Sequence, residues 1–274
     1  MRTIISNQQF DEERALYGLR AGDVINCLFA GPADGESVLK EARDVNLTRC
    51  DFSLRYPLWH VEGFSMEQCN MDEKTRAAIW YATGGQISHC NLGGIKAVRE
   101  CKDIHISDSD IVSQEFGWKS ENISLKDCSI TAEYVFLDSK DVTLENVQMK
   151  GKYSFQYMEN LTIRDSYLDT KDAFWHSKNV TVVNSTVKGE YLAWFSDGDP
   201  HRLPHHRHPA SVLLQGLKAR QLHHGGNRSV FRVFRCGCHH QWPCGFRQES
   251  PVRPHHGGLC GRSHHGRCRD GMHR

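Results

Sequence analysis

The strongest constraint on the fold is a repeat of nineteen residues in the body of the chain. Four segments show it: NISLKDCSI, DVTLENVQM, NLTIRDSYL and NVTVVNSTV. We take one position in each repeat as its reference, and these reference residues lie nineteen apart at Cys128, Val147, Ser166 and Ser185. Earlier reference residues are Cys27, Cys50, Cys69, Cys90 and Ser109. Some of these intervals are longer because of insertions, which include GPADGESVLK (residues 31–40) and EKTRAAIWYATGG (residues 73–85). A fixed period of this length indicates a solenoid in which each repeat stacks on its neighbour.

Apolar residues occupy fixed positions in each repeat. They stand five and three residues before the reference and two after it, as Ile123, Leu125 and Ile130 do around Cys128. Apolar and polar residues alternate within each short piece, which predicts strands with one buried face. The alternation slips by one directly before the reference, where the residue is usually Asp or Asn. These residues tolerate a left-handed backbone, so we expect a sharp corner between two strands.

These features predict an all-β fold: a right-handed parallel β-helix, built as a single-stranded solenoid with about 19 residues per coil. The nine reference residues predict nine coils, with the reference column inside as a ladder of small side chains. A helical repeat is disfavoured because β-branched residues fill the apolar columns. A left-handed hexapeptide helix fits poorly because nineteen is not a multiple of six. A pentapeptide-repeat solenoid remains a weaker alternative.

Several segments of the body resemble a known bacterial family: FDEERALYGL, GPADGESVLKEARDV, DFSLRYPLWH, KAVRECKDI, EFGWKSENI and DAFWHSKNV. The family is known as domain of unknown function 3737, and the resemblance covers residues 1–198. It implies a pectin-lyase-like β-helix. It implies no catalytic residues, because none are assigned to the family.

The composition changes abruptly at residue 199. Residues 199–274 hold thirteen of the chain's 17 histidines, together with six of its 8 prolines and twelve arginines, but only three acidic residues. The pair His-His occurs five times, at positions 205, 223, 239, 255 and 264. We therefore separate a β-helix domain, residues 1–198, from a tail rich in His, Arg, Pro and Cys, residues 199–274, which we expect to be disordered.

The genetic code offers an explanation for this tail. Reading the codons one nucleotide later permits the segment that starts at Asp199 to become TLIDCHIIGTQPLCYCKGLKLVNCTMEA. Two pieces of that reading, LIDCHI and LVNCTM, restore the pattern of strand, Asp or Asn, Cys and apolar residue. Their cysteines fall on Leu203 and Leu222, again nineteen apart. We interpret the tail as the out-of-frame product of a nucleotide insertion or deletion near codon 198.

The alternative for the tail is a metal site. Cys236, Cys238, Cys244 and Cys260 stand among histidines, as in CGCHHQWPC. Structural zinc prefers cysteine pairs separated by two to four residues, and Cys-Gly-Cys is tighter than that. We therefore predict no metal site and no cofactor, and keep a metal-binding tail as a minor alternative.

Candidate functional residues lie in the third segment of each repeat, which is rich in aromatic and charged side chains. Segments such as YPLWHVE, EFGWKS, KYSFQYM and KDAFWHS belong to it. Aromatic rings beside polar groups are typical of a surface that stacks on and hydrogen-bonds to a sugar chain. The ligand-binding candidates are Trp59, His60, Trp118, Tyr157, Trp175 and Trp194.

The same segments hold the catalytic candidates Arg99, Lys119, Asp138 and His176, because β-helix lyases and hydrolases carry acids and bases on such an outer strip. No two acids share a column on neighbouring repeats, as a paired acid and base would require. A structural interpretation, in which the aromatic residues fill the third wall of the core, is favoured. The parity is ambiguous, since Phe136 and the tryptophan column cannot face the same way.

Two function classes follow. The first is a non-catalytic scaffold that binds a glycan or a protein, and the second is a polysaccharide lyase or glycoside hydrolase. The beginning, MRTIISNQQFDEERALYGL, carries acidic residues where a signal peptide would be apolar, so we expect a cytoplasmic location and reduced cysteines. With 34 basic and 33 acidic residues and no basic strip in the body, no nucleic-acid partner is indicated. No apolar run is long enough for a membrane span.

Overall fold

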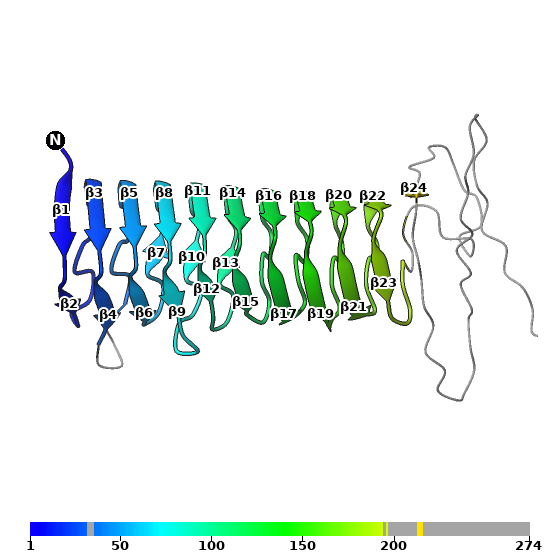
Figure 1. Ribbon diagram of the computed structural model, residues 1–274, viewed down its shortest axis with the longest axis horizontal. Coiled ribbons are helices and arrows are strands. Elements are labelled where there is room, and N and C mark those ends of the chain that lie inside the picture. Colours follow the sequence, from blue (N-terminus) through cyan, green and yellow to red (C-terminus); the bar gives the residue numbers. More distant parts are fainter. Residues whose placement is uncertain (32–35, 194–195, 197–212, 216–274) are drawn as a thin grey trace, which may run out of the picture. The chain divides into compact units, whose positions relative to one another are not determined.

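The structure is a computed structural model that describes residues 1–31, 36–193, 196 and 213–215. The described residues all fall within one compact unit, Met1–Trp242. They contain strands and turns but no helix. The strands form three parallel sheets, A, B and C, that run along the stack of coils (Figure 1).

Sheet A contains β1 (Thr3–Ser6), β3 (Arg20–Ile25), β5 (Arg43–Thr48), β8 (Glu62–Glu67), β11 (Thr83–Ser88), β14 (Lys102–Ser107), β16 (Glu121–Lys126), β18 (Lys140–Glu145), β20 (Glu159–Arg164), β22 (Lys178–Val183) and β24 (Leu213–Gln215). Sheet B contains β2 (Gln9–Phe10), β4 (Leu28–Ala30), β6 (Asp51–Ser53), β9 (Asn70–Met71), β12 (Asn91–Leu92), β15 (Asp110–Val112), β17 (Ser129–Glu133), β19 (Gln148–Lys152), β21 (Tyr167–Lys171) and β23 (Thr186–Lys188). Sheet C contains β7 (Leu58–Trp59), β10 (Ile79–Trp80) and β13 (Val98–Arg99).

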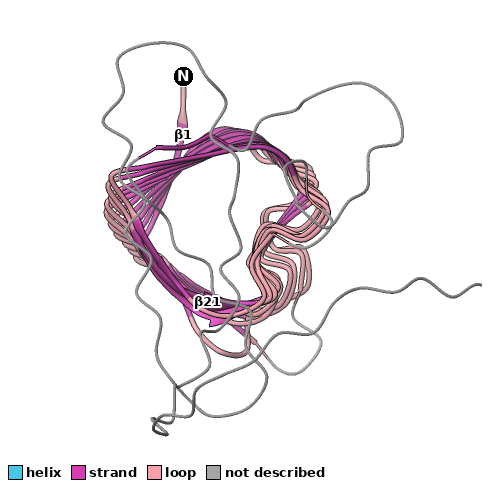
Figure 2. Cartoon of the chain, turned by 90° about the vertical axis from the view of Figure 1, so that its right-hand side faces the viewer, coloured by secondary structure: helices cyan, strands magenta, loops and turns pink. Residues whose placement is uncertain are grey.

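Each coil consists of one strand of sheet A, a corner, one strand of sheet B and a third segment that returns to sheet A. Strand pairs repeat at a step of nineteen residues, as in Val142 opposite Leu161 and Leu161 opposite Val180. Viewed along the stack in Figure 2, the chain passes from sheet A round the short corners to sheet B and returns through the third segments. This winding is right-handed, the usual hand of parallel crossovers. The prediction of an all-β parallel β-helix with nineteen-residue coils is confirmed.

The corners between sheets A and B have the predicted left-handed backbone. The ten corner residues have φ between 48° and 55° in the described part of the chain: Asn7, Asn26, Arg49, Gln68, His89, Asp108, Asp127, Asn146, Asp165 and Asn184. A second left-handed residue lies near the start of most sheet A strands. Asn122, Asn160 and Asn179 stand there, and each donates its side-chain N–H to an Asp or Asn of the preceding coil at 2.6 to 2.9 Å.

The apolar columns form the interior as predicted. The apolar residues five and three positions before the reference, such as Ile104 and Ile106, are at most 4% exposed in the described coils. The reference column is buried too, from Cys27 at 1% to Ser185 at 2%. Phe10, Phe29 and Phe52 stack along sheet B with centroids 5.2 and 4.9 Å apart. Fully burying one such side chain contributes about 1.5–3 kcal/mol.

The described part contains ten coils, and the prediction of nine missed the first. Its strands are β1 and β2, with its corner at Asn7. The reference position of this coil is Gln8, which is exposed because no coil of the described part lies on its outer side. Without a small buried residue there, the first coil does not show the reference signature.

The predicted insertion at residues 73–85 is also larger than the one observed. Asp72 and Thr75 form a turn in which the Asp72 carbonyl accepts the Thr75 N–H at 3.1 Å, and this turn absorbs the added length. The residues that follow include β10 and the beginning of β11, so most of the segment is regular coil.

The last described strand departs from the regular step. β24 adds to sheet A with Leu213 opposite Thr181, a separation of 32 residues instead of nineteen. The predicted tail, residues 199–274, otherwise lies outside the described residues, and so do its metal-ligand candidates.

Candidate functional site on the third face

The third segments bend toward the interior before they return to sheet A (Figure 2). We call the surface formed by their outward side chains the third face. Three residues of a typical third segment have a left-handed backbone, as Tyr153 (φ 56°), Phe155 (φ 59°) and Tyr157 (φ 57°) do in one coil. Such residues change the direction of the chain every second position, which produces the bend.

The third face has two conformations that meet at Gly117. In the coils of β7, β10 and β13 the middle of the segment is extended and forms sheet C. In the coils that follow, the equivalent residues Gly117, Phe136, Phe155 and Phe174 are left-handed, with φ from 53° to 77°. A Cβ at Gly117 would overlap the ring of Phe136, so glycine suits this change of conformation.

The structure resolves which aromatic residues point inward. Phe116, Phe136 and Phe155 are 0% exposed and belong to the core. The tryptophans one position after the inward column, such as Trp118 and Trp175, are half-buried and lie on the outer side. The phenylalanines therefore form the third wall, and the tryptophans and tyrosines fill the bend outside it.

Around sheet C the outer side chains form a stack along the coil axis. Lys40 Nζ lies 3.8 Å from the Trp59 ring centroid, Trp59 stacks on Trp80 at 5.2 Å, and Arg99 lies 5.7 Å from Trp80. Trp59, Trp80 and Arg99 are in register on neighbouring strands, so their side chains lie one above another along the coil axis. Tyr56 packs against both indoles at 5.9 and 5.6 Å. The buried Nε1 atoms of Trp59 and Trp80 have no hydrogen-bond partner within the described part of the chain.

Beyond Gly117, side chains on the return side of the bend reach across it to a carbonyl sixteen residues further on. Trp118 Nε1 donates to Tyr134 O at 2.6 Å, and Trp175 Nε1 donates to Tyr191 O at 2.7 Å. Gln156 Nε2 does the same to Asp172 O at 3.0 Å. These bonds close the bend and fix the outer side chains in place.

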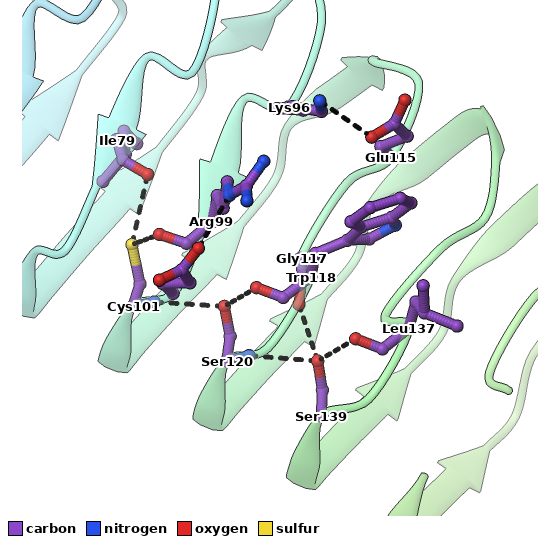
Figure 3. Close-up of polar contacts among 11 residues, drawn as sticks. Ile79, Lys96, Arg99, Cys101, Glu115, Gly117, Trp118, Ser120, Leu137 and Ser139 are labelled. Carbon is purple, nitrogen blue, oxygen red and sulfur yellow. Dashed lines mark hydrogen bonds and ion pairs between the residues drawn. The ribbon is translucent and has the colours of Figure 1, made fainter. Parts of the chain in front are cut away.

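A buried ladder holds the return corner together (Figure 3). The Ser120 hydroxyl accepts the Cys101 N–H at 3.2 Å, and the Ser139 hydroxyl accepts the Ser120 N–H at 3.0 Å. Each hydroxyl also donates to a backbone carbonyl, Trp118 O at 3.2 Å for Ser120 and Gly117 O at 2.8 Å for Ser139. Burial raises the pKa of the Cys101 thiol to about 12, so that thiol stays protonated and inert.

The catalytic candidates are spread over four coils. Arg99 Nε donates to Glu100 Oε1 at 2.8 Å in the region of Figure 3. Partial burial raises the pKa of Glu100, but hydrogen bonds from Tyr81 and Arg99 outweigh it and leave that pKa lowered. Asp138 and His176 are left-handed corner residues two coils apart, a backbone separation of about 9.6 Å at the usual strand spacing. The structure does not bring them into one acid–base pair.

Lys119 is the return-corner residue next to Glu100, and its charge lowers the pKa of that carboxyl. It is exposed, as is Asp138 on the next coil. The catalytic candidates thus lie on one outer row without converging on a common point.

The ligand-binding candidates also lie on the third face. Trp59 belongs to the stack around sheet C, and His60 meets Tyr81 edge-on at 5.1 Å and Glu41 at 3.4 Å. Tyr157 stacks on His176 at 4.8 Å with an interplanar angle of 6°. Trp194 lies outside the described residues.

Sequence reasoning missed five residues of this face: Tyr56, Trp80, Tyr81, Gln156 and Asp172. Trp80 and Tyr81 follow the turn at Asp72, which moves them two positions away from the column to which they belong. The other three stand in columns of mixed composition, and only the fold shows that these columns face each other across the bend.

Among residues 1–31, 36–193 and 196, no cluster of His, Cys, Asp and Glu is placed to hold a metal ion. Across the same residues, no helix is long and apolar enough to cross a membrane.

Comparisons with known proteins give a family and distant structural matches. A search of curated proteins returned no match. A solved structure of a trypsin-treated variant of QnrB1, a plasmid-mediated fluoroquinolone resistance protein, is 13% identical and aligns over 80% of this chain and 92% of that chain, with a TM-score of 0.33. A second trypsin-treated variant of QnrB1 is 14% identical over 80% of this chain and 90% of that chain, with a TM-score of 0.24. The model of the family described as "Protein of unknown function (DUF3737)" matches residues 3–198, and the chain therefore belongs to this family.

Proposed function

We propose that the protein is a non-catalytic β-helix scaffold that binds a protein partner through its third face. The observation that carries this proposal is the arrangement of the aromatic rings. Trp59 stacks on Trp80, Tyr134 stacks on Tyr153 at 4.7 Å, and Tyr157 stacks on His176. Stacked rings cover one another's faces, so they present edges and hydroxyl groups outward.

This arrangement favours a protein over a glycan. A sugar ring stacks on a free aromatic face, and the faces in these stacks are already covered. Protein interfaces are enriched in Tyr, Trp and Arg that combine apolar area with hydrogen-bonding groups. Tyr81, Tyr157 and Tyr191 are 43%, 54% and 46% exposed. Their backbones are held by neighbouring coils, so little conformational entropy is lost when a partner binds.

A cytoplasmic location is part of the same proposal. Six cysteines of the described residues are unpaired and buried: Cys27, Cys50, Cys69, Cys90, Cys101 and Cys128. Unpaired thiols are usual where the surroundings are reducing.

The test is a selection of displayed random peptides on the whole protein. Peptides that bind the wild type are then measured against Tyr134→Ala/Tyr157→Ala. The matched control is Thr143→Ala/Thr162→Ala, which alters paired residues on the outer side of sheet A. We expect the tyrosine variant to bind at least about tenfold more weakly and the control to bind normally, as for loss of interface hot spots. Peptides that bind both variants equally would contradict the proposal.

A parallel screen against neutral and acidic polysaccharides covers the other function classes. Retention on a polysaccharide that is lost in Trp80→Ala would replace the protein partner with a glycan. Release of sugar products that is abolished by Asp138→Asn or His176→Ala would establish a lyase or hydrolase instead.

A further inference from the structure

Beyond Gly117, one place on the third face has polar residues on both sides of the bend. In three coils, the outer position on the entry side of the bend holds Tyr134, Tyr153 and Tyr191, but the coil between the last two holds Asp172. On the return side, the position that Trp118 occupies in its coil is taken by Gln156. Gln156 and Asp172 face each other, because Gln156 Nε2 donates to Asp172 O at 3.0 Å. Two polar side chains thus stand where the pairs Trp118 with Tyr134 and Trp175 with Tyr191 carry rings.

Both side chains are recessed. Asp172 is 8% exposed and Gln156 is 9% exposed, whereas Tyr134 and Tyr191 in the same column as Asp172 are 37% and 46% exposed. Within the described residues, no donor is hydrogen-bonded to the Asp172 carboxylate or to Gln156 Oε1, and none of these oxygens is wholly buried, so each still reaches the solvent. A recessed carboxylate to which no protein group donates is open to a donor from a ligand.

The charges around this point favour a cation. Lys152 is paired with Glu133 at 3.1 Å, so its charge is compensated. Lys171 Nζ lies 5.6 Å from the Tyr191 ring centroid, and Glu190 contributes a second negative charge. With Asp172 ionised, the three groups Asp172, Glu190 and Lys171 together carry one net negative charge. The flanking tyrosine rings add to this preference, because aromatic rings attract cations.

We propose that Asp172 and Gln156 form a recognition point for a basic side chain, Arg or Lys, of the protein partner. This inference rests on the proposed function and names its chemistry. The guanidinium or ammonium group brings several N–H donors and no acceptor, which matches two acceptors that have no donor. Tyr153 and Tyr191 flank the incoming group in the aromatic column. An ion pair shielded in this way is stronger than one on the open surface.

The peptide selection also tests this proposal, with Asp172→Asn as the decisive variant. Asn keeps the size of the side chain and removes the charge. The matched control is Asp165→Asn, a corner of the same coil where other coils already carry Asn. We expect third-face peptides to share an Arg or Lys, and to bind Asp172→Asn at least about tenfold more weakly than the control, as for loss of a charged hydrogen bond. Replacing that Arg or Lys in the peptide by Gln should give the same loss.

Failure of this proposal differs from failure of the proposed function. Third-face peptides that lack a basic residue, or that bind Asp172→Asn normally, would overturn the recognition point alone. If no peptide depends on the third face, both proposals fall.

The free protein offers a second measurement. Asp172→Tyr introduces the residue that the two neighbouring coils carry at the equivalent position, Tyr153 and Tyr191, where the backbone is also left-handed. We expect it to raise the melting temperature, because a recessed carboxylate to which no described group donates is removed, and to abolish peptide binding. Burial raises the pKa of Asp172, so peptide binding should also fade at a higher pH than for an ordinary aspartate as the solution is acidified. A lower melting temperature in Asp172→Tyr would indicate a structural role and contradict the proposal.

Discussion

At the residue scale, the coil depends on left-handed backbone positions that are seldom glycine. Such a conformation costs about 1–2 kcal/mol for a non-glycine residue. Hydrogen bonds to the neighbouring coils offset this cost. The N–H of Tyr153 is donated to Lys171 O of the next coil, and that of Phe155 to Val135 O of the preceding coil, both at 2.7 Å. The residues that bend the coil therefore also bind it to its neighbours.

Gly117 tests whether space as well as backbone angle matters at these positions. Gly117→Ala places a methyl group against the buried Phe136 ring, and we expect a loss of about 3 kcal/mol or more in the free energy of unfolding. Gly18 is the matched control, because it has a similar φ of 66° and nothing within 4 Å of the new methyl group. Gly18→Ala should cost about 1 kcal/mol. Equal losses in urea unfolding would show that the Phe136 contact is unimportant.

Arg2 links the first three coils through ion pairs. It donates to Asp23 at 2.7 Å and to Asp44 at 2.8 Å. The hydrogen bond from Arg2, followed by that from Asn46, lowers the pKa of Asp23. The resulting stabilisation is therefore present above the ordinary aspartate pKa of about 3.9 and is lost as the pH falls through the lowered value.

We expect the amides of β1 to lose protection against hydrogen exchange over that acidic range, after correction for intrinsic exchange rates. Arg2→Gln should remove most of this pH dependence while leaving the middle coils unchanged. A pH dependence in Arg2→Gln equal to that of the wild type would rule out the link.

At the element scale, each coil is joined to the next by side-chain ladders as well as by strands. Ser and Cys predominate in these ladders because both are small and can accept a backbone N–H. The Cys90 N–H is donated to the Ser109 hydroxyl at 3.0 Å, and the Cys50 N–H to the Cys69 sulfur at 3.4 Å. This explains the composition of the reference column better than size alone.

Ser120 tests the ladder as an element of stability. Ser120→Ala leaves the buried Cys101 N–H without its acceptor, so we expect a loss of about 1–3 kcal/mol in the free energy of unfolding. Ser120→Cys keeps an acceptor and uses the residue that the preceding coil carries, so its loss should be smaller. Chemical unfolding measures the free energy of unfolding of the two variants. An equal loss in both would show that the effect comes from packing and not from the hydrogen bond.

At the scale of the whole molecule, a solenoid is most vulnerable at its ends. Among the described strands, only β24 continues sheet A beyond β22, and it does so out of the nineteen-residue step. No described strand pairs with the outer edge of β23 in sheet B. Open strand edges favour association with other chains. The proposed frame slip near codon 198 would account for this change of step at β24.

Restoring the reading frame should therefore cover the last described coil with further coils and raise the solubility and stability of the protein. We expect a version whose tail carries the restored coils, LIDCHI and LVNCTM among them, to be more soluble and to melt at a higher temperature than the present chain. Light scattering and thermal unfolding of both proteins measure this. Equal solubility and equal melting temperatures would argue against the frame slip, as would a nucleotide sequence that encodes the present tail in every related gene.

Much of the fold follows from the sequence because a solenoid repeats one local problem. The columns around Cys128 and Ser166 recur at a fixed step, so each coil predicts the next. The first coil was not predicted because its reference position holds Gln8, which is exposed, instead of a small buried residue. Trp80 was not predicted because two added residues place it eleven positions after its reference residue instead of nine. In the structure it nevertheless lies in register with Trp59.

The sequence by itself determined the period, the two strands of each coil and the left-handed corners, because alternation of apolar and polar residues reports the buried face of any extended strand. Only the tertiary structure decided the third face. Val135 and Phe136 are neighbours and are both 0% exposed, which no alternating pattern predicts. The cause is the left-handed backbone at Tyr134, Phe136 and Asp138, which turns the chain at every second residue. It also brings Gln156 opposite Asp172, a pairing across the bend that no local pattern encodes.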